Sequence, residues 1–420
     1  MQRVLMIAFQ FPPFSGSVGV QRTLRFVQHL PHFGWQPAVV SAWPRAYETT
    51  DPGSTGEVPD GTVVRRTFAL DAKRHLGIAG RYSAALARPD RWWMTWVPSA
   101  VAGSLRLIRQ IRPDVIWATY PIPAALRIGS LIHRLTGLPW IADFRDPMAQ
   151  EGYPADHRTW LTYKAIEEDA ISSAAFSVFT TQDAAQLYRV RYRDAVDRIR
   201  IIENGYDEDS FAAVESAARS AGPLAADRIT LLHSGVIYSP DRDPKCLFAA
   251  LARLKRRGLL DPARFRIRFR APQFDAFLRG LASEMGVLDL IESMPPIPYR
   301  EALEEMIRAD ALVLLSGADF SAQVPAKLYE YLRAARPILG LTDPLSSSAR
   351  VLHAAGVHNV APLESVDGIE TLLANLLAAL ATATAQCPEQ AVVRGYSRRA
   401  RAGELAALLQ AASSSPAKVT

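Results

Sequence analysis

The chain has 420 residues, which is too long for one ordinary domain and predicts two or three. Its 49% apolar and 21% charged residues exclude a disordered chain, and no apolar run reaches the roughly 18 residues of a transmembrane helix. Only two cysteines are present, which indicates a reducing compartment or no structural use of disulfides. The net charge of +6 lies in residues 1–205, with 24 basic and 18 acidic residues; the remainder has 24 of each.

The first strand is predicted at residues 4–9, because a short apolar run ends at Pro12 and Pro13. The run is too short for a signal peptide, so a cytoplasmic protein is expected. A loop containing Gly16 and Gly19 then precedes a helix over residues 21–30. Glycines before a helix let backbone N–H groups approach an anion closely, although a plain tight turn explains the same pattern.

A second strand is predicted at residues 36–41 and a long loop at 43–61. Twelve basic residues but only three acidic ones lie between residues 65 and 134, and Trp92, Trp93 and Trp96 follow Arg91. This pattern fits contact with an anionic membrane, contact with nucleic acid, or a solvated basic face over buried tryptophans. Membrane contact is favoured over nucleic acid, because no nucleic-acid module pattern is present.

Strands at residues 114–119 and 139–142 end at chemically active side chains. Thr119 ends the first, and Asp143, Arg145 and Asp146 follow the second. Residues just beyond the carboxyl end of a parallel strand are candidates for a binding site. Helix capping, or an ion pair with Arg145, explains the two aspartates equally well.

The first domain is expected to end at residue 210, and the Ala- and Ser-rich residues 211–227 are interpreted as a linker. The second domain, 228–392, opens with a strand that ends at a glycine turn, Gly235. Arg242 and Lys245 flank the start of the next helix, where cations and free N–H groups could hold a diphosphate. His233, before the glycine turn, is interpreted as structural.

A strand at residues 309–315, a loop, a helix starting at Pro325 and a strand at 338–341 form the central unit of the second domain. Lys327 and Glu330 share a helix face, where an ammonium can meet a phosphate and a carboxylate can accept two sugar hydroxyls. A solvated ion pair is the plainer alternative. A C-terminal helix over 393–412, which could pack back on the first domain, and a tail over 413–420 complete the chain.

Six segments in order resemble family 4 glycosyltransferases, in particular a bacterial branch that builds surface polysaccharides: FPPFSGSVGVQR, DVIWATYPIP, WIADFRDP, IENGYDEDSF, HSGVIY and PAKLYEYLRAARPIL. The resemblance implies an α/β protein of the GT-B fold, with two Rossmann-like domains facing across a cleft. It also implies transfer of a sugar from a nucleotide-diphosphate sugar to a polysaccharide or lipid-linked glycan, with retention at the anomeric carbon.

The resemblance assigns roles to particular residues. Glu330 would hold the ribose of the donor, and with Arg242 and Lys245 it forms the expected catalytic set. The expected donor-binding residues are Gly16, Gly19, Gly235, Pro325, Lys327 and Glu330. The expected acceptor-side residues are Arg22, Thr119, Asp143, Arg145 and Asp146. No cofactor or metal is implied, because GT-B enzymes generally work without a metal, so Asp243 in the Asp241-Arg242-Asp243 triplet is expected to cap a helix.

The implied partners are a nucleotide sugar and a glycan or polyprenyl-diphosphate-linked acceptor, with peripheral contact at the inner face of the plasma membrane and no nucleic acid. The chain departs from the family pattern at Ala322, where a first glutamate is usual, at Thr119, where many members have histidine, and at Val236, where a basic residue is common. Two alternatives therefore stay open. One is a catalytically silent homologue that binds nucleotide sugars or scaffolds a polysaccharide complex; the other is an epimerase or an inverting transferase.

Overall fold

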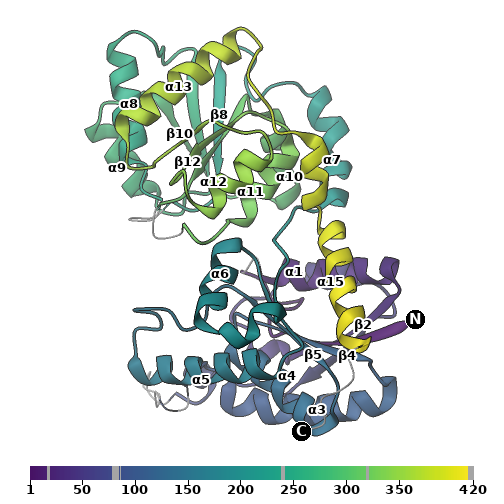
Figure 1. Ribbon diagram of the computed structural model, residues 1–420. Helices are drawn as coiled ribbons and strands as arrows, with labels where there is room; N and C mark the ends of the chain where they lie inside the picture. The colour runs from purple at the N-terminus through teal and green to yellow at the C-terminus, as the bar shows by residue number, and fades with distance from the viewer. Residues whose placement is uncertain (17–18, 78–84, 86, 238–241, 318–320, 415–420) are drawn as a thin grey trace. The chain divides into compact units, whose positions relative to one another are not determined.

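The computed structural model describes residues 1–16, 19–77, 85, 87–237, 242–317 and 321–414. The chain forms two compact units: unit 1 is Met1–Glu203 with the chain from Arg398 onward, and unit 2 is Asn204–Ser397. Figure 1 shows that each unit consists of a sheet and the helices that cover it. The chain leaves unit 1 and returns to it. Inside unit 2 its outgoing and returning segments are joined, because Tyr206 N–H donates to Tyr396 O at 3.2 Å.

The sheet of unit 1 has seven strands in the order β3-β2-β1-β4-β5-β6-β7. Every neighbouring pair is parallel. The order reverses between β1 and β4, and open α/β sheets bind ligands at such a reversal, outside the carboxyl ends of the strands. The strands are β1 (Gln2–Ile7), β2 (Trp35–Ala42), β3 (Val63–Thr67), β4 (Val115–Thr119), β5 (Trp140–Arg145), β6 (Phe176–Phe179) and β7 (Ile199–Ile201).

Two helix layers cover this sheet, because alternate strand residues point to opposite faces. In β1, Leu5 and Ile7 belong to the core beneath α3, α4 and α5, whereas Val4 and Met6 belong to the core beneath α1 and α15. Figure 1 shows these two groups of helices around the sheet. The helices are α1 (Gly19–His29), α2 (Ala72–His75), α3 (Trp93–Ile111), α4 (Pro123–Thr136), α5 (His157–Ser173), α6 (Gln182–Arg191) and α15 (Arg398–Ser414).

The sheet of unit 2 has six parallel strands in the order β10-β9-β8-β11-β12-β13. Its order reverses between β8 and β11, so the expected ligand crevice lies at the carboxyl ends of these two strands. The strands are β8 (Ile229–Ser234), β9 (Phe265–Arg270), β10 (Ile291–Met294), β11 (Ala311–Leu315), β12 (Ile338–Leu341) and β13 (Val360–Ala361).

Unit 2 repeats the two-layer packing. In β11, Val313 packs beneath α8, α9 and α13, and its neighbours Leu312 and Leu314 pack beneath α7, α10, α11 and α12. The helices are α7 (Glu208–Ser220), α8 (Lys245–Arg256), α9 (Asp275–Glu284), α10 (Tyr299–Arg308), α11 (Ala326–Ala334), α12 (Ser347–Ala354), α13 (Val366–Ala381) and α14 (Gln390–Val393). The 3-10 segments within the described residues are η1 (Leu30–Phe33), η2 (Pro44–Ala46), η3 (Pro52–Glu57), η4 (Arg193–Arg198), η5 (Leu288–Leu290) and η7 (Arg394–Tyr396).

Helix α7 occupies much of the segment that the sequence suggested as a linker, 211–227, and begins before it. Phe211, Val214 and Ala218 lie on one helix face and are buried in the core of unit 2. Asp207 caps the helix by accepting from Ser210 N–H at 3.1 Å. The linker interpretation is therefore wrong for residues 211–220, because Ala and Ser content concealed three apolar positions at helical spacing. The chain enters unit 2 at Asn204, before the expected boundary at residue 210.

The elements β3, α2 and α3 of unit 1 were not predicted from the sequence, and α3 begins inside the Arg- and Trp-rich segment. Trp92 and Trp96 are 9% and 0% exposed and belong to the core. Arg91 lies 3.2 Å from Asp71 and 5.0 Å from the ring centroid of Trp92. The two indoles are therefore buried, as expected for a solvated basic face over buried tryptophans. Residues 91–96 do not form a row of exposed aromatic side chains.

The C-terminal helix α15 belongs to unit 1. Its residues Leu405 and Leu409 pack in the same core as Leu24 and Val27 of α1. Arg401 binds Glu203 at 3.1 Å, which ties the helix to the end of the first chain segment. Among all helices in the described ranges, none is long and apolar enough to cross a membrane.

Candidate functional site

Gly235, directly after β8, lies against the side chain of Lys327 in the first turn of α11. Its φ angle is +123°, and a Cβ atom there would lie 2.6 Å from Lys327 Nζ. No other residue type takes this backbone conformation easily while leaving room for the ammonium. β8 and α11 meet at the point where the strand order of unit 2 reverses. The glycine turn therefore brings a cation to the expected ligand crevice.

The Lys327 ammonium is also in contact with a buried histidine. Its Nζ lies 3.4 Å from His233 Nε2, and the other ring nitrogen of His233, Nδ1, lies 2.9 Å from Val313 O. This geometry assigns a neutral imidazole, with Nδ1–H donating to the carbonyl and Nε2 accepting from the ammonium. Burial, and next the charge of Lys327, hold the pKa of His233 well below its usual value. His233 therefore positions the lysine and carries no charge of its own.

Lys327 changes its charge state near neutral pH, because its pKa is lowered. Burial, and next the nearby Arg242, lower the pKa of Lys327 to about 7, while Glu330 opposes this shift. A lysine with such a pKa binds a proton when an anion arrives beside it. The plain solvated ion pair that the sequence left open does not describe this lysine, because its ammonium contacts Gly235 and His233.

Glu330 lies one turn further along α11. Its Oε1 accepts from the Tyr299 hydroxyl at 2.9 Å. Next to it, the hydroxyl of Tyr331 accepts from Ser234 N–H at 2.8 Å and so anchors α11 to the end of β8. A carboxylate can accept several hydrogen bonds, as the recognition of neighbouring sugar hydroxyls requires.

The two cations expected at the diphosphate, Arg242 and Lys245, are placed differently. Arg242 is partly exposed, its Nη1 lies 3.5 Å from Val236 O, and its charge acts on both Lys327 and His233. Lys245 is exposed in the first turn of α8, and the contacts described for its side chain do not include Lys327 or His233. Asp243 Oδ1 accepts from Lys245 N–H at 2.9 Å, but the N-cap residue of α8 is Pro244, so Asp243 lies one position before the cap that the sequence predicted for it. Asp241 lies outside the described residues.

The remaining donor-side residue, Pro325, is the N-cap of α11, with φ −64° and ψ 136°, so the helix starts one residue later than predicted. Ala322 is partly exposed in the loop that leads to it. The first turn of α11 thus presents backbone N–H groups on the same side as Lys327, where an anion is stabilised.

In unit 1, Arg22 and Asp143 bind each other. Arg22 Nε and Nη2 donate to the two carboxylate oxygens of Asp143, both at 2.9 Å, and the Thr119 hydroxyl lies 2.9 Å from Asp143 Oδ2. The exposed fractions of the Arg22 and Asp143 side chains are 3% and 0%. A buried bidentate pair of this kind holds α1 against the ends of β4 and β5. The structure therefore gives these three acceptor-side candidates a structural role.

Arg145 differs from Arg22 in its backbone conformation and in its hydrogen bonds. It lies at the end of β5 after a register shift, with φ +63°. It is 9% exposed; Nη1 donates to Tyr120 O at 3.3 Å, and Nε has no partner among the described residues. Burial lowers the pKa of Arg145, while the neighbouring Asp146 opposes this shift. Burial also raises the pKa of the Asp146 carboxyl, which Arg145 opposes.

Of the two glycines in the first loop, only Gly19 packs closely against this guanidinium. A Cβ atom on Gly19, the first residue of α1, would lie 2.7 Å from Arg145 Nη1 and 1.9 Å from Gln10 Oε1. Gly16 has φ +90°, and its neighbour Ser15 pairs with Thr49. The structure thus brings Gly19 and Arg145 together at the reversal point of unit 1, whereas Gly16 serves the loop's turn.

Sequence reasoning undervalued three residues: His233, Tyr299 and Gln10. His233 was interpreted as structural, which fits its bond to Val313, but its second nitrogen supports Lys327. Tyr299 and Gln10 carry no motif of their own. A signal existed only for His233, because it directly precedes a glycine turn at the end of a buried strand.

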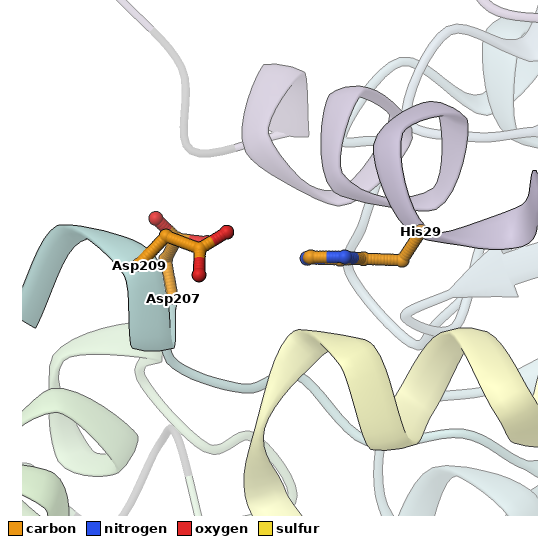
Figure 2. A group of neighbouring side chains, drawn as sticks. All are labelled: His29, Asp207 and Asp209. Carbon is orange, nitrogen blue, oxygen red and sulfur yellow. The ribbon is translucent and has the colours of Figure 1, made fainter. Parts of the chain in front are cut away.

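Figure 2 draws His29 of α1 with Asp207 and Asp209, which lie at the start of α7. Histidine and aspartate are residue types that ligate metals. His29 belongs to unit 1 and the two aspartates belong to unit 2, so they are not assigned to a common site. Asp207 is already the cap of α7.

Comparisons with known proteins agree with this architecture. Residues 19–205 match the family model of the glycosyl transferase 4-like domain. No curated protein sequence matches the chain.

Among solved structures, sucrose-phosphate synthase from Thermosynechococcus elongatus is 14% identical with a TM-score of 0.64, covering 98% of this chain and 99% of that chain. HepE of Anabaena, solved with UDP and with UDP-glucose, is 13% identical with a TM-score of 0.63, covering 98% and 100%. WaaG, a glycosyltransferase involved in lipopolysaccharide biosynthesis, is 16% identical with a TM-score of 0.59, covering 98% of both chains. These likenesses show a shared two-domain α/β fold.

Proposed function

We propose that this protein is a retaining glycosyltransferase, because residues 19–205 match the model of the glycosyl transferase 4-like domain and the chain has the GT-B fold. It moves a sugar from a nucleotide-diphosphate sugar to a glycan or a polyprenyl-diphosphate-linked acceptor. One observation carries the proposal: Gly235, Lys327 and Glu330 converge at the strand-order reversal of unit 2. The HepE structures with UDP and UDP-glucose support a nucleotide-sugar donor.

In this proposal the donor diphosphate lies against the Lys327 ammonium, which occupies the space that the missing side chain of Gly235 leaves. Lys327, Arg242 and the N–H groups at the start of α11 supply positive charge. These groups oppose the charge that develops on the leaving diphosphate, which is the main catalytic contribution of such a site. Glu330, oriented by Tyr299, accepts hydrogen bonds from the ribose hydroxyls.

Retention follows if the leaving diphosphate takes the acceptor's proton on the same face of the sugar, so no side chain serves as general base. The cations of unit 2 then do the work that a metal ion does elsewhere, and we propose a metal-independent reaction. In unit 1, the Arg145 guanidinium lies beside the start of α1, and its Nε has no partner among the described residues; it is the group that we expect to meet an anionic part of a substrate.

A ligand panel tests the donor proposal. UDP-, GDP-, ADP- and dTDP-sugars, with NAD as control, are titrated calorimetrically into the wild type and into Glu330→Ala. We expect one nucleotide sugar to bind, with a loss of affinity of tenfold or more, about 1.4 kcal/mol, in the variant. Binding of none of them would overturn the proposal.

Incubation of the same nucleotide sugars with the protein, followed by product analysis, separates the alternatives. The mutual pairing of Arg22, Asp143 and Thr119 is the observation that favours a silent homologue, because these acceptor-side candidates are occupied by one another. A donor that binds but is neither transferred nor hydrolysed indicates that homologue. Transfer with inversion, or epimerisation of the donor sugar, indicates the other GT-B activities, and NMR of the product's anomeric centre distinguishes them.

We also propose contact with an anionic membrane, at the inner face of the plasma membrane, through an exposed aromatic patch of unit 1. Trp43 and Phe68 are 38% and 49% exposed, with ring centroids 6.3 Å apart. The guanidinium of Arg45 lies 4.9 Å from the Trp43 ring. Aromatic rings beside cations suit the headgroup region of an anionic membrane.

Co-sedimentation with vesicles tests this contact. The wild type should bind vesicles containing phosphatidylglycerol and not pure phosphatidylcholine, and a Trp43→Ala, Phe68→Ala double variant should bind several-fold more weakly. Equal binding by this double variant would remove the patch from the proposal. Absence of binding to anionic vesicles would remove the membrane itself.

A further inference from the structure

A pocket of about 500 Å³ opens in unit 1 beside the carboxyl end of β5. It is formed by the chain that follows β5, the beginning of α5 and the end of α6. Ligand pockets in proteins commonly have volumes of about 300–1,000 Å³. None of the residues discussed above as donor or acceptor candidates lines it. Its principal lining residues are Gln150, Glu151, Gly152, His157, Trp160 and Arg191.

The cation of this pocket, Arg191, is held rigidly. Its Nη1 donates to Glu167 Oε1 at 2.7 Å and to Ala149 O at 2.8 Å. Glu167 is 0% exposed and also accepts from Ala149 N–H at 3.0 Å and from the hydroxyls of Tyr188 and Tyr192. A buried carboxylate is costly unless its partners are complete, so this network fixes the guanidinium in place. The Arg191 side chain remains 25% exposed, and it is therefore available to a ligand.

The aromatic wall of the pocket is fixed as well. Trp160 Nε1–H donates to Gln150 O at 2.8 Å, which sets the plane of the indole. The His157 ring lies almost parallel to it, at 7° and 6.1 Å between centroids. Gln150 and Tyr153 exchange backbone hydrogen bonds at 2.9 and 3.2 Å, so the loop that carries Glu151 closes on itself. The pocket is thus built before a ligand arrives.

We propose that this pocket binds one sugar ring of the glycan acceptor, an inference that rests on the proposed glycosyltransferase function. The apolar C–H face of a pyranose packs on the Trp160 indole. Its hydroxyls accept from the Arg191 guanidinium and donate to the Glu151 carboxylate. Because Glu167 and Glu168 balance the charges of Arg191 and Lys164, the pocket favours a sugar ring over a multiply charged phosphate.

Saturation-transfer NMR on the full chain tests the inference. The probes are methyl glycosides of glucose, galactose, mannose, N-acetylglucosamine and glucuronic acid. We expect transfer to at least one of them, reduced fivefold or more in Trp160→Ala and retained in part in Trp160→Phe, which keeps an aromatic face. Leu161→Ala, an exposed neighbour on the same helix, is the matched control and should bind like the wild type.

Three outcomes would overturn the inference: no transfer to any glycoside, equal transfer in Trp160→Ala, or loss of transfer in Glu330→Ala, which would place the sugar in unit 2. Thermal unfolding of Trp160→Ala confirms that the variant is folded. Calorimetry with nucleotide sugars on the same samples keeps the two proposals apart. Donor binding that fails while glycosides still bind contradicts the proposed function alone, and the reverse contradicts only this pocket.

Discussion

At the residue scale, Lys327 connects the geometry of unit 2 to a measurable pH dependence. Its ammonium lies between Gly235 and the neutral His233, with a pKa of about 7. The lysine is therefore mostly charged below pH 7 and mostly neutral above it. The diphosphate of a nucleotide sugar keeps its negative charge across this range, so the lysine alone should set the pH dependence of donor binding.

We predict that donor affinity is highest near about pH 6 and falls by up to roughly tenfold per pH unit above 7. The fall stops where the pH exceeds the raised pKa of the lysine in the complex. Calorimetry from about pH 6 to about pH 8.5 measures it. Lys327→Met should bind weakly with a flat profile. A wild-type affinity that does not change with pH would contradict the assignment of this lysine to the diphosphate.

The buried pair of Arg22 and Asp143 predicts a stability effect. Asp143→Asn leaves the Arg22 charge buried without its carboxylate, so the free energy of unfolding of unit 1 should fall by about 3–5 kcal/mol. Urea unfolding followed by tryptophan fluorescence measures this loss, because all eight tryptophans lie in residues 1–205.

The exposed pair of Arg253 and Asp367 is the control for this prediction. Their side chains are 43% and 89% exposed, so Arg253→Ala should leave the unfolding transition almost unchanged. If Asp143→Asn proved as stable as the wild type, the pair would be dispensable for folding. Its assignment to an acceptor would then regain support.

At the element scale, the turn after β8 and the first turn of α11 together form the proposed donor site. Gly235→Ala places a methyl group where the Lys327 ammonium lies, in a backbone conformation that alanine resists. We expect donor affinity to fall tenfold or more, measured by calorimetry. Gly280→Ala in α9, where a Cβ meets open space, should leave donor binding unchanged. Equal affinity for both variants would show that the ligand does not use this turn.

A second prediction at this scale concerns hydrogen exchange in helix α7. Because its apolar face is buried in unit 2, its backbone amides should exchange slowly with solvent. Hydrogen exchange over residues 212–220 should therefore be slow in the wild type and fast in Val214→Asp. Ser216→Asp, on the exposed face, serves as control. Fast exchange in the wild type would restore the linker interpretation.

At the scale of the whole molecule, the chain completes its first unit with its last helix. Leu405 and Leu409 of α15 are 1% and 0% exposed in the core beneath α1. Each buried leucine contributes about 1.5–3 kcal/mol relative to exposure. Unit 1 therefore depends on a segment that the chain reaches only after unit 2.

We predict that truncation after residue 397 lowers the unfolding temperature of unit 1 markedly while donor binding by unit 2 persists. Calorimetric unfolding shows the first effect and ligand titration the second. Truncation after residue 414, which leaves α15 intact, is the control. An unchanged unfolding temperature in the shorter chain would mean that α15 is not part of the core of unit 1.

Much of the architecture follows from local patterns. The short apolar runs at residues 114–119 and 309–315 are β4 and β11 within a residue or two, and the segment from Pro325 to Leu341 is the predicted helix and strand. Prediction failed where we relied on the composition of a segment. The alanines and serines of α7 suggested a linker, and the tryptophans and arginines near the start of α3 suggested a surface patch. Periodicity reports burial of a local face, whereas composition alone does not.

The sequence by itself determined two parallel α/β halves, the strand ends that carry the candidate residues, and the motif of Lys327 and Glu330. Only the tertiary structure decided which of these residues meet. Lys327 contacts His233 across 94 positions of the chain, and Arg22 binds Asp143 across 121. Such pairs depend on strand order, because parallel strands distant in the sequence bring their carboxyl ends to one edge of a sheet. Local spacing contains no information about that order.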